Sequence, residues 1–224
     1  MLQLPLGSSE RELRTLLCLG AHCDDIEIGC GGTVLHLVDL YPDLHVHWVV
    51  LSSSPTRAQE ARASAEHFLH KVQNKNVIIK EFRNSFFPFV GAQIKEFFEE
   101  IKGQVSPDLV LTHTRYDLHQ DHRLTCELTW NTFRNHLILE YEIPKYDGDL
   151  STPNFFMPLQ PEQYNAKIDY LLEYFPSQRD KSWFTRETFL ALMRLRGMES
   201  NARSGYAEAF YCRKAVMAPS RINR

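Results

Sequence analysis

The order of hydrophobic and polar residues along the chain alternates between two patterns. Short runs of consecutive apolar residues, typical of buried strands, are followed by stretches in which apolar residues recur every three or four positions, typical of helices. Strands are predicted at residues 15–19, 45–51, 76–82 and 108–112, and helices at residues 33–39, 57–70, 91–102 and 121–135. This alternation predicts an α/β fold in which crossover connections build a mostly parallel sheet covered on both faces.

The pattern changes after residue 137. Residues 137–142 form a further predicted strand, and residues 145–161, which include three prolines, are expected to form a long surface loop of a kind that often carries function. Helices are predicted at residues 162–174 and 185–198, and a last strand within residues 206–216. The chain shows no internal repeat and no clear boundary, so we expect a single domain over residues 1–224.

The composition of the chain argues against several classes of protein. The 224 residues carry a net charge of −3 and no basic block, which argues against a surface that tracks nucleic-acid phosphates. The N-terminal residues match neither a signal peptide nor a membrane anchor, and no apolar stretch approaches the roughly 18 residues of a membrane span. The five cysteines lack CxxC spacing, which argues against a disulfide framework and fits a reducing compartment. We therefore expect a soluble cytoplasmic protein.

Two polar clusters follow the first and the fourth predicted strands. The first is His22-Cys23-Asp24-Asp25, and the second is the segment 117–122, with the sequence DLHQDH. Parallel strands deliver functional groups at their carboxyl ends, so the clusters would open into one crevice if the two strands are neighbours. Adjacent carboxylates repel each other unless a cation or a proton lies between them.

These residue types suit a catalytic metal site. Imidazole and carboxylate groups bind divalent metals, and three ligands leave one position open for chemistry. One of Asp24 and Asp25 could bind the metal while the other acts as a general base on water. His119 and His122 share a helical face, so one could be a ligand while the other points into the pocket. Asp121 could orient an imidazole, and these residues alone leave open which member of each pair takes which role.

Simpler explanations exist for each cluster alone. An HxxH segment often marks the start of a helix capped by an aspartate such as Asp117 or Asp121, and an HxDD segment could form a turn that leads into a helix. Two such clusters at two strand ends are much harder to explain structurally. Grouped carboxylates and imidazoles are typical of functional sites.

The clusters also resemble the signatures of a known family. The segment AHCDDIEIGCGGT resembles the AHPDDxExxxGGT signature of the LmbE-like, or PIG-L-like, zinc-dependent N-deacetylases, and YDLHQDH resembles their second, HPDH-type signature. Weaker similarity covers residues 54–66 and 203–210. The resemblance implies a Rossmann-like three-layer sandwich with a mostly parallel central sheet. It also implies hydrolysis of the N-acetyl group of an amino sugar of the N-acetylglucosamine type.

The resemblance assigns a role to each candidate residue. It implies zinc ligands at His22, Asp25 and His122, a general base at Asp24, an oxyanion stabiliser and acid at His119, an orienting partner at Asp121, and a substrate contact at Arg57. One Zn²⁺ per chain is expected, and Fe²⁺ would be accepted by the same ligands. The implied partner is an N-acetylated sugar, with no nucleic acid and no membrane anchor. The resemblance also allows a homo-oligomer, a trimer or hexamer as in relatives.

The chain departs from the family pattern at two prolines. Cys23 and Gln120 replace them, which should loosen both loops, and the Cys23 thiol would be either a small buried filler or a fourth ligand. We expect His113 to line the pocket, and the glycines of the first segment to allow a tight turn before the helix. Two other functions remain open: a metallohydrolase of another small amide or ester, and a weakly catalytic metal- or sugar-binding protein.

Overall fold

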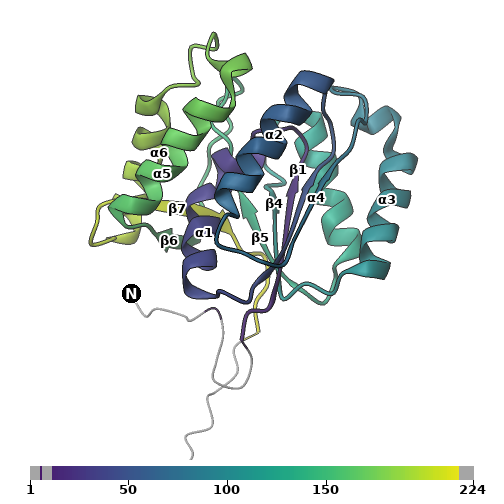
Figure 1. Cartoon of the computed structure of the whole chain (residues 1–224), viewed down its shortest axis with the longest axis horizontal. Coiled ribbons are helices and arrows are strands. Elements are labelled where there is room, and N and C mark those ends of the chain that lie inside the picture. The colour runs from purple at the N-terminus through teal and green to yellow at the C-terminus, as the bar shows by residue number, and fades with distance from the viewer. Residues whose placement is uncertain (1–5, 7–11, 217–224) are drawn as a thin grey trace, which may run out of the picture.

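A seven-stranded sheet in the order β3-β2-β1-β4-β5-β7-β6 forms the centre of the computed structural model (Figure 1). The structure describes residue 6 and residues 12–216. The strands are β1 (Thr15–Gly20), β2 (His45–Val50), β3 (Lys75–Ile79), β4 (Leu109–His113), β5 (Leu137–Tyr141), β6 (Phe155–Pro158) and β7 (Ala207–Tyr211). Strands β1 to β5 pair in parallel, and β7 is antiparallel to both of its neighbours. The mostly parallel sheet is thus confirmed.

Helices cover both faces of this sheet. They are α1 (Asp25–Leu40), α2 (Pro55–Phe68), α3 (Gly91–Gln104), α4 (Gln120–Thr132), α5 (Pro161–Tyr174) and α6 (Arg186–Ser200), with the short 3₁₀ helices η1 (Phe87–Phe89) and η2 (Pro176–Gln178). Helices α1, α2, α5 and α6 lie on one face and α3 and α4 on the other (Figure 1). Successive residues of β1 point to opposite faces of the sheet, so that Leu16 lies in one apolar core and Leu17 in the other. The α/β three-layer sandwich is confirmed.

Most predicted elements lie within three residues of the observed ones, but the expected loop over residues 145–161 is wrong in part. It contains strand β6, which pairs only with β7. This strand is a short apolar run of four residues that ends in a proline and lies at the edge of the sheet, so its backbone pairing with β7 fixes it as a strand. The last strand, β7, is also shorter than the predicted range 206–216.

Helix α1 begins eight residues earlier than predicted and is broken in its middle. Its first residue is Asp25 rather than residue 33, and Cys30 has non-helical angles (φ −145°, ψ 15°). The glycines therefore lie inside the helix and not in a turn before it. A Cβ atom at Gly29 would lie 2.1 Å from Cδ2 of Tyr141, and one at Gly32 would lie 2.5 Å from Leu159. Here the glycines permit close packing of the helix against the sheet and its covering segments.

A carboxylate from the far end of the chain caps the second half of this helix. Glu208 of β7 accepts hydrogen bonds from the backbone N–H of Gly32 (2.8 Å) and of Thr33 (2.6 Å), and from the Thr33 hydroxyl (2.6 Å). The buried ammonium of Lys167 lies 2.6 Å from the same carboxylate. The N–H groups left free by the break are thus satisfied by a negative charge, which also suits a helix N-terminus.

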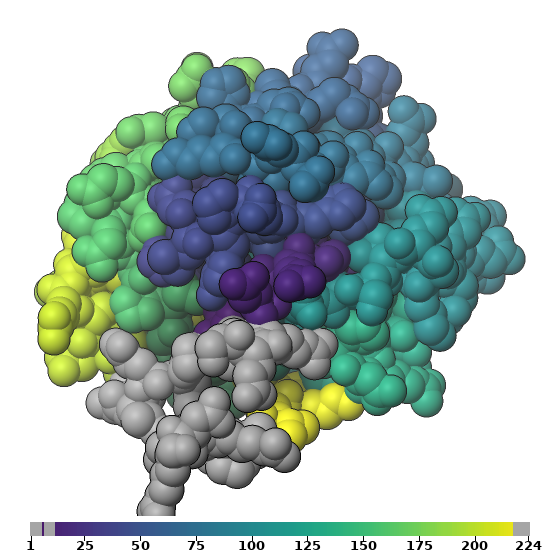
Figure 2. Space-filling view, turned by 60° about the horizontal axis from the view of Figure 1, so that its bottom comes forward, coloured from purple at the N-terminus to yellow at the C-terminus, as the bar shows by residue number. Residues whose placement is uncertain are grey.

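The strand order reverses between β1 and β4, which are directly paired in parallel. The carboxyl ends of such neighbouring strands form the usual crevice of an open α/β sheet, so both polar clusters meet there. Because β7 is antiparallel, it ends on the side of the sheet where the parallel strands begin. The N-terminal (purple) and C-terminal (yellow) parts of the described chain lie on one face there (Figure 2). None of the described helices has the length and hydrophobicity needed to cross a membrane.

Candidate metal centre

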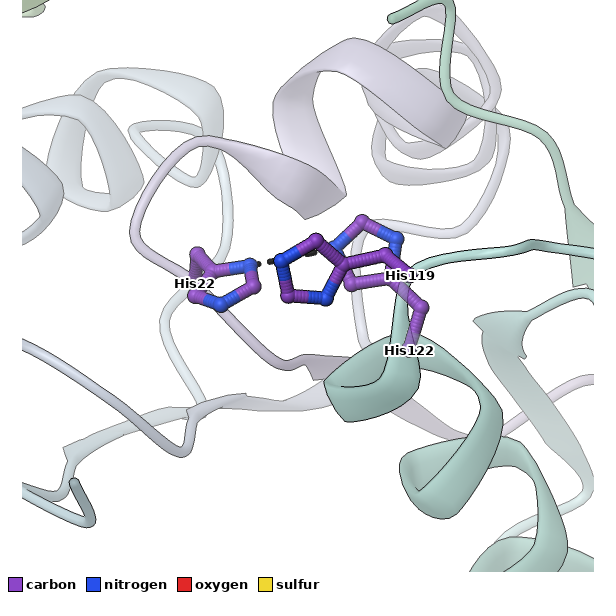
Figure 3. Close-up of side chains that lie close together, drawn as sticks. All are labelled: His22, His119 and His122. Carbon is purple, nitrogen blue, oxygen red and sulfur yellow. Dashed lines mark hydrogen bonds between the residues drawn. The ribbon is translucent and has the colours of Figure 1, made fainter. Parts of the chain in front are cut away.

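Three donor atoms from the two clusters form a nearly equilateral triangle. His22 Nδ1 lies 3.0 Å from His122 Nε2 and 3.3 Å from Asp25 Oδ2, and the last two atoms are 3.4 Å apart. The rings converge from the loop after β1 and from the start of α4 (Figure 3). Zinc–ligand bonds of about 2.0–2.1 Å in a tetrahedron place the donors about 3.3–3.4 Å apart. The donor set and its spacing therefore fit a divalent metal, with a fourth position open.

Each of the two imidazoles is held from behind by a buried carboxylate. Nε2 of His22 lies 3.3 Å from Oδ2 of Asp121, and Nδ1 of His122 lies 2.8 Å from Oδ2 of Asp117. Such contacts fix the ring orientation and leave the other nitrogen free to bind metal. Asp121 is itself held by the backbone N–H groups of Ser85 (2.6 Å) and Phe87 (3.1 Å).

Asp24, the expected base, lies beside the triangle at the start of α1 and is almost fully buried. Its Oδ1 atom forms an ion pair with Nη2 of Arg57 at 2.7 Å. Arg57 comes from the first turn of α2, which follows β2, the strand next to β1. The structure thus places Arg57 at the centre, but against Asp24. A contact of Arg57 with substrate stays a prediction.

His119 precedes α4 and faces His22 and His122, the two candidate ligand histidines. Its ring centroid is 4.9 Å from that of His22 and 4.6 Å from that of His122. Its Nδ1 accepts the backbone N–H of Asp121 (3.2 Å), so the neutral ring carries its proton on Nε2. Burial lowers the pKa of His119, and the neighbouring His122 and His22 lower it further. The Asp121 carboxylate bonds to other groups, so its expected role in orienting His119 stays a prediction.

Burial and charge set the remaining pKa values of the centre. Burial alone would lower the pKa of His22, but the Asp25 and Asp121 carboxylates outweigh it and raise this pKa to about 10. Burial alone would raise the pKa of Asp25, but the neighbouring histidines hold it well below its usual value. The centre is therefore rich in buried negative charge, as a cation site requires.

Two further residues join the centre that no motif singled out as partners. His113, expected only to line the pocket, lies at the end of β4 with its Nε2 3.1 Å from Oδ2 of Asp25. Its ring stacks on His122 at 3.9 Å, and burial lowers its pKa to about 4, so it is neutral. Lys145 lies 3.0 Å from Asp117. A single lysine in a polar loop carries no sequence signal for such a contact.

The two residues that replace family prolines have separate contacts. The Cys23 thiol is buried and donates to the backbone carbonyl of Ser52 at the end of β2 (3.4 Å). Burial raises its pKa to about 12, and in the described part of the chain Cys23 joins no group with metal-ligand spacing. The buried-filler interpretation therefore fits. The Gln120 amide donates to the backbone carbonyl of Ser85, in the loop that Asp121 also holds.

Comparison with known proteins agrees with this geometry. The model of the GlcNAc-PI de-N-acetylase (PIG-L) family matches residues 17–133, just over half of the chain. The chain belongs to this family. Both clusters of the metal centre lie inside the matched PIG-L region. No curated protein sequence matches the chain.

Solved structures show the same PIG-L-like fold. The conserved protein TT1542 from Thermus thermophilus matches with a TM-score of 0.72 and 18% identity, over 93% of this chain and 98% of that one. The N,N'-diacetylchitobiose deacetylase from Pyrococcus horikoshii matches with a TM-score of 0.61 and 20% identity, over 89% and 83%. GalB, the 4-carboxy-2-hydroxymuconate hydratase from Pseudomonas putida, matches with a TM-score of 0.67 and 16% identity, over 93% and 99%. At these identities the likeness concerns the fold.

Proposed function

We propose that the protein is a metal-dependent deacetylase that removes the N-acetyl group from an N-acetylated amino sugar or its conjugate. The products would be acetate and a free amine. The observation that carries the proposal is the donor triangle of His22, Asp25 and His122, with Asp24 beside it and His119 facing it. Membership of the GlcNAc-PI de-N-acetylase family supports the same reaction class.

The ligand set suits zinc. Two imidazole nitrogens and one carboxylate oxygen, with one open position, are typical of catalytic zinc sites, and Fe²⁺ would also accept them. When bound, the ion supplies a Lewis acid that polarises the acetamide carbonyl and makes water more acidic. His22, Asp25 and His122 would hold it, and Asp121 and Asp117 would keep the two rings oriented.

Asp24 would move the proton of the reaction. As a carboxylate it accepts a proton from the water that attacks the acetamide carbon, so a C–O bond forms while the carbonyl becomes an oxyanion. When the C–N bond breaks, the same proton passes to the amine, and acetate remains. The ion pair with Arg57 would keep the Asp24 carboxylate in place beside the metal site.

His119 would stabilise the oxyanion. Because its Nδ1 accepts a backbone N–H, its Nε2 proton is available to donate toward the centre. Its lowered pKa keeps the ring neutral near pH 7, which favours hydrogen-bond donation over delivery of a full proton. Asp24 is therefore the better source of the proton for the leaving amine.

The acyl group and the amine of the substrate define a second candidate function. The fold also supports a hydratase, GalB, so the fold alone does not select an acetamide. The same water-activating residues would serve a metallohydrolase of another small amide or ester. This second candidate predicts that acyl groups other than acetyl are released as fast or faster.

The test is release of the acyl group as free acetate or propionate by zinc-loaded protein, measured over a library of N-acetylated amino sugars and their conjugates. Each compound is paired with its N-propionyl and O-acetyl counterparts, and the Asp24→Asn variant is the control. Release from an N-acetyl sugar, and not from its O-acetyl counterpart, supports the proposal. Preferred release from the counterparts supports the second candidate. Stoichiometric zinc with no release from any compound contradicts both.

A further inference from the structure

Lys145 is a nearly buried cation between two buried carboxylates. Its side chain is 10% exposed, and its Nζ lies 3.0 Å from Oδ2 of Asp117 and forms a second ion pair with Asp149. A lysine is rarely buried unless it is paired, and here one ammonium group balances two negative charges. The lysine lies in the segment that connects β5 to β6.

Asp117 links this lysine to His119 and His122. Its Oδ2 lies 2.8 Å from Nδ1 of His122, and its Oδ1 accepts the backbone N–H of His119 at 2.8 Å. Asp149 acts on the same loop, because its carboxylate accepts the backbone N–H of Leu118 at 2.7 Å. Residues 117–122, with His119 at the end of the loop and His122 in the first turn of α4, are therefore held by two carboxylates. Among the described residues, the only cation that these carboxylates share is Lys145.

We propose that Lys145 is a positioning residue of the metal centre, acting through Asp117. Its charge holds the Asp117 carboxylate against Nδ1 of His122, so that His122 keeps its proton on Nδ1 and presents Nε2 to the metal. Without the lysine, Asp117 and Asp149 would repel each other and turn away from the loop. This inference rests on the metal site of the proposed function.

The expected effect is a loss of metal affinity. Removal of a group that orients a metal ligand typically weakens metal binding about 10–100-fold. Lys145→Met and Lys145→Gln should both bind zinc at least tenfold more weakly than the wild type. Lys145→Gln keeps a polar end group and loses only the charge. Lys145→Arg keeps the charge and should recover most of the affinity.

A double-mutant cycle tests whether Lys145 acts through Asp117. Zinc affinity is measured by competition with a chromophoric chelator for the wild type, Lys145→Met, Asp117→Asn and the double variant. Lys75→Met is the matched control, since Lys75 is also a partly buried lysine in an ion pair, with Glu66, but lies at the start of β3. If Lys145 acts through Asp117, the Lys145 substitution causes no further loss in the Asp117→Asn background.

The Nδ1 proton of His122 supplies a readout that a purely structural role would not move. In ¹⁵N-labelled protein this proton should exchange slowly in the wild type and in Lys145→Arg, and rapidly in Lys145→Gln. Wild-type affinity in both Lys145→Gln and Lys145→Met, or additive losses in the double variant, would overturn the inference. A wild type that binds no zinc would overturn the proposed function together with the inference, so the two failures are distinguishable.

Discussion

Nδ1 of His22 and Nε2 of His122 lie 3.0 Å apart, although a hundred residues separate them in the chain. They meet because β1 and β4 are neighbours in the sheet, at the point where the strand order reverses. Each ring has its second nitrogen occupied by a buried carboxylate, so the two facing nitrogens are the ones that remain for a shared cation. The order of strands in the sheet thus assembles the centre.

The roles of Asp24 and His22 can be separated by substitution. Asp24→Asn should retain zinc and lose turnover by a factor of about 10²–10⁴, because the amide cannot accept a proton from water. His22→Ala should lose both zinc and turnover. Acetate release and metal content of the purified variants give the two readouts, with Asp43→Asn, an exposed carboxylate before β2, as the control. Full activity of Asp24→Asn would exclude Asp24 as the base.

Zinc affinity should depend on pH through His22. Its pKa is raised to about 10 in the absence of metal, so at pH 6–9 zinc must displace a proton from the ring. Affinity should therefore rise with pH, on the order of tenfold per unit across this window, and level off above about pH 10. Calorimetry in buffers of different ionisation enthalpy should show about one proton released per zinc. A flat affinity between pH 6 and 9 would contradict the charged state of His22.

Two glycines in helices should respond in opposite ways to alanine. In Gly29→Ala the new Cβ would lie 2.1 Å from the fully buried ring of Tyr141, so unfolding free energy should fall by about 1–3 kcal/mol. In Gly103→Ala, near the end of α3, no atom lies within 4 Å of the new Cβ, and stability should rise by about 0.5 kcal/mol. Urea unfolding of both variants measures the difference. Equal effects would mean that α1 does not pack as described.

The buried contacts of Glu208 should make a large contribution to stability. Glu208→Gln removes the negative charge that faces Lys167 and the N–H groups of Gly32 and Thr33, and leaves the lysine buried and unpaired. The expected loss is about 3–5 kcal/mol of unfolding free energy. Glu99→Gln, which breaks only exposed ion pairs with Lys95 and Lys102, should cost less than about 1 kcal/mol. Similar losses in both variants would refute the capping role.

The fold was predictable where local pattern and environment agree. Strands β1 and β4 are buried on both faces, so most of their residues are apolar at successive positions. Strand β6 is only four residues long, ends in a proline and lies at the edge of the sheet, so its state depends on pairing with β7. The first half of α1 contains glycines that disfavour a helix in isolation. Its helical state depends on packing against Tyr141 and on Glu208, which lie far along the chain.

The candidate site likewise has residues that the sequence could predict and contacts that it could not. The residues of the triangle lie in two short motifs, so their chemistry can be read from neighbouring positions. His113 reaches Asp25 because β1 and β4 are adjacent, and Lys145 reaches Asp117 because β4 and β5 are adjacent. No local pattern reveals these neighbours. The Asp24–Arg57 ion pair likewise depends on α2 starting beside β1. Contacts between segments that are distant in sequence are the part that required the structure.

The cap on α1 has a consequence for how the centre forms during synthesis. All three proposed metal ligands lie within the first 122 residues, but the carboxylate that completes the helix after Asp25 comes from residue 208. A nascent chain that has left the ribosome only as far as α4 holds every ligand and still lacks this support. The centre therefore matures only after residue 208 has been synthesised, and a stop or frameshift between codons 122 and 208 would impair the site although every ligand is encoded before it.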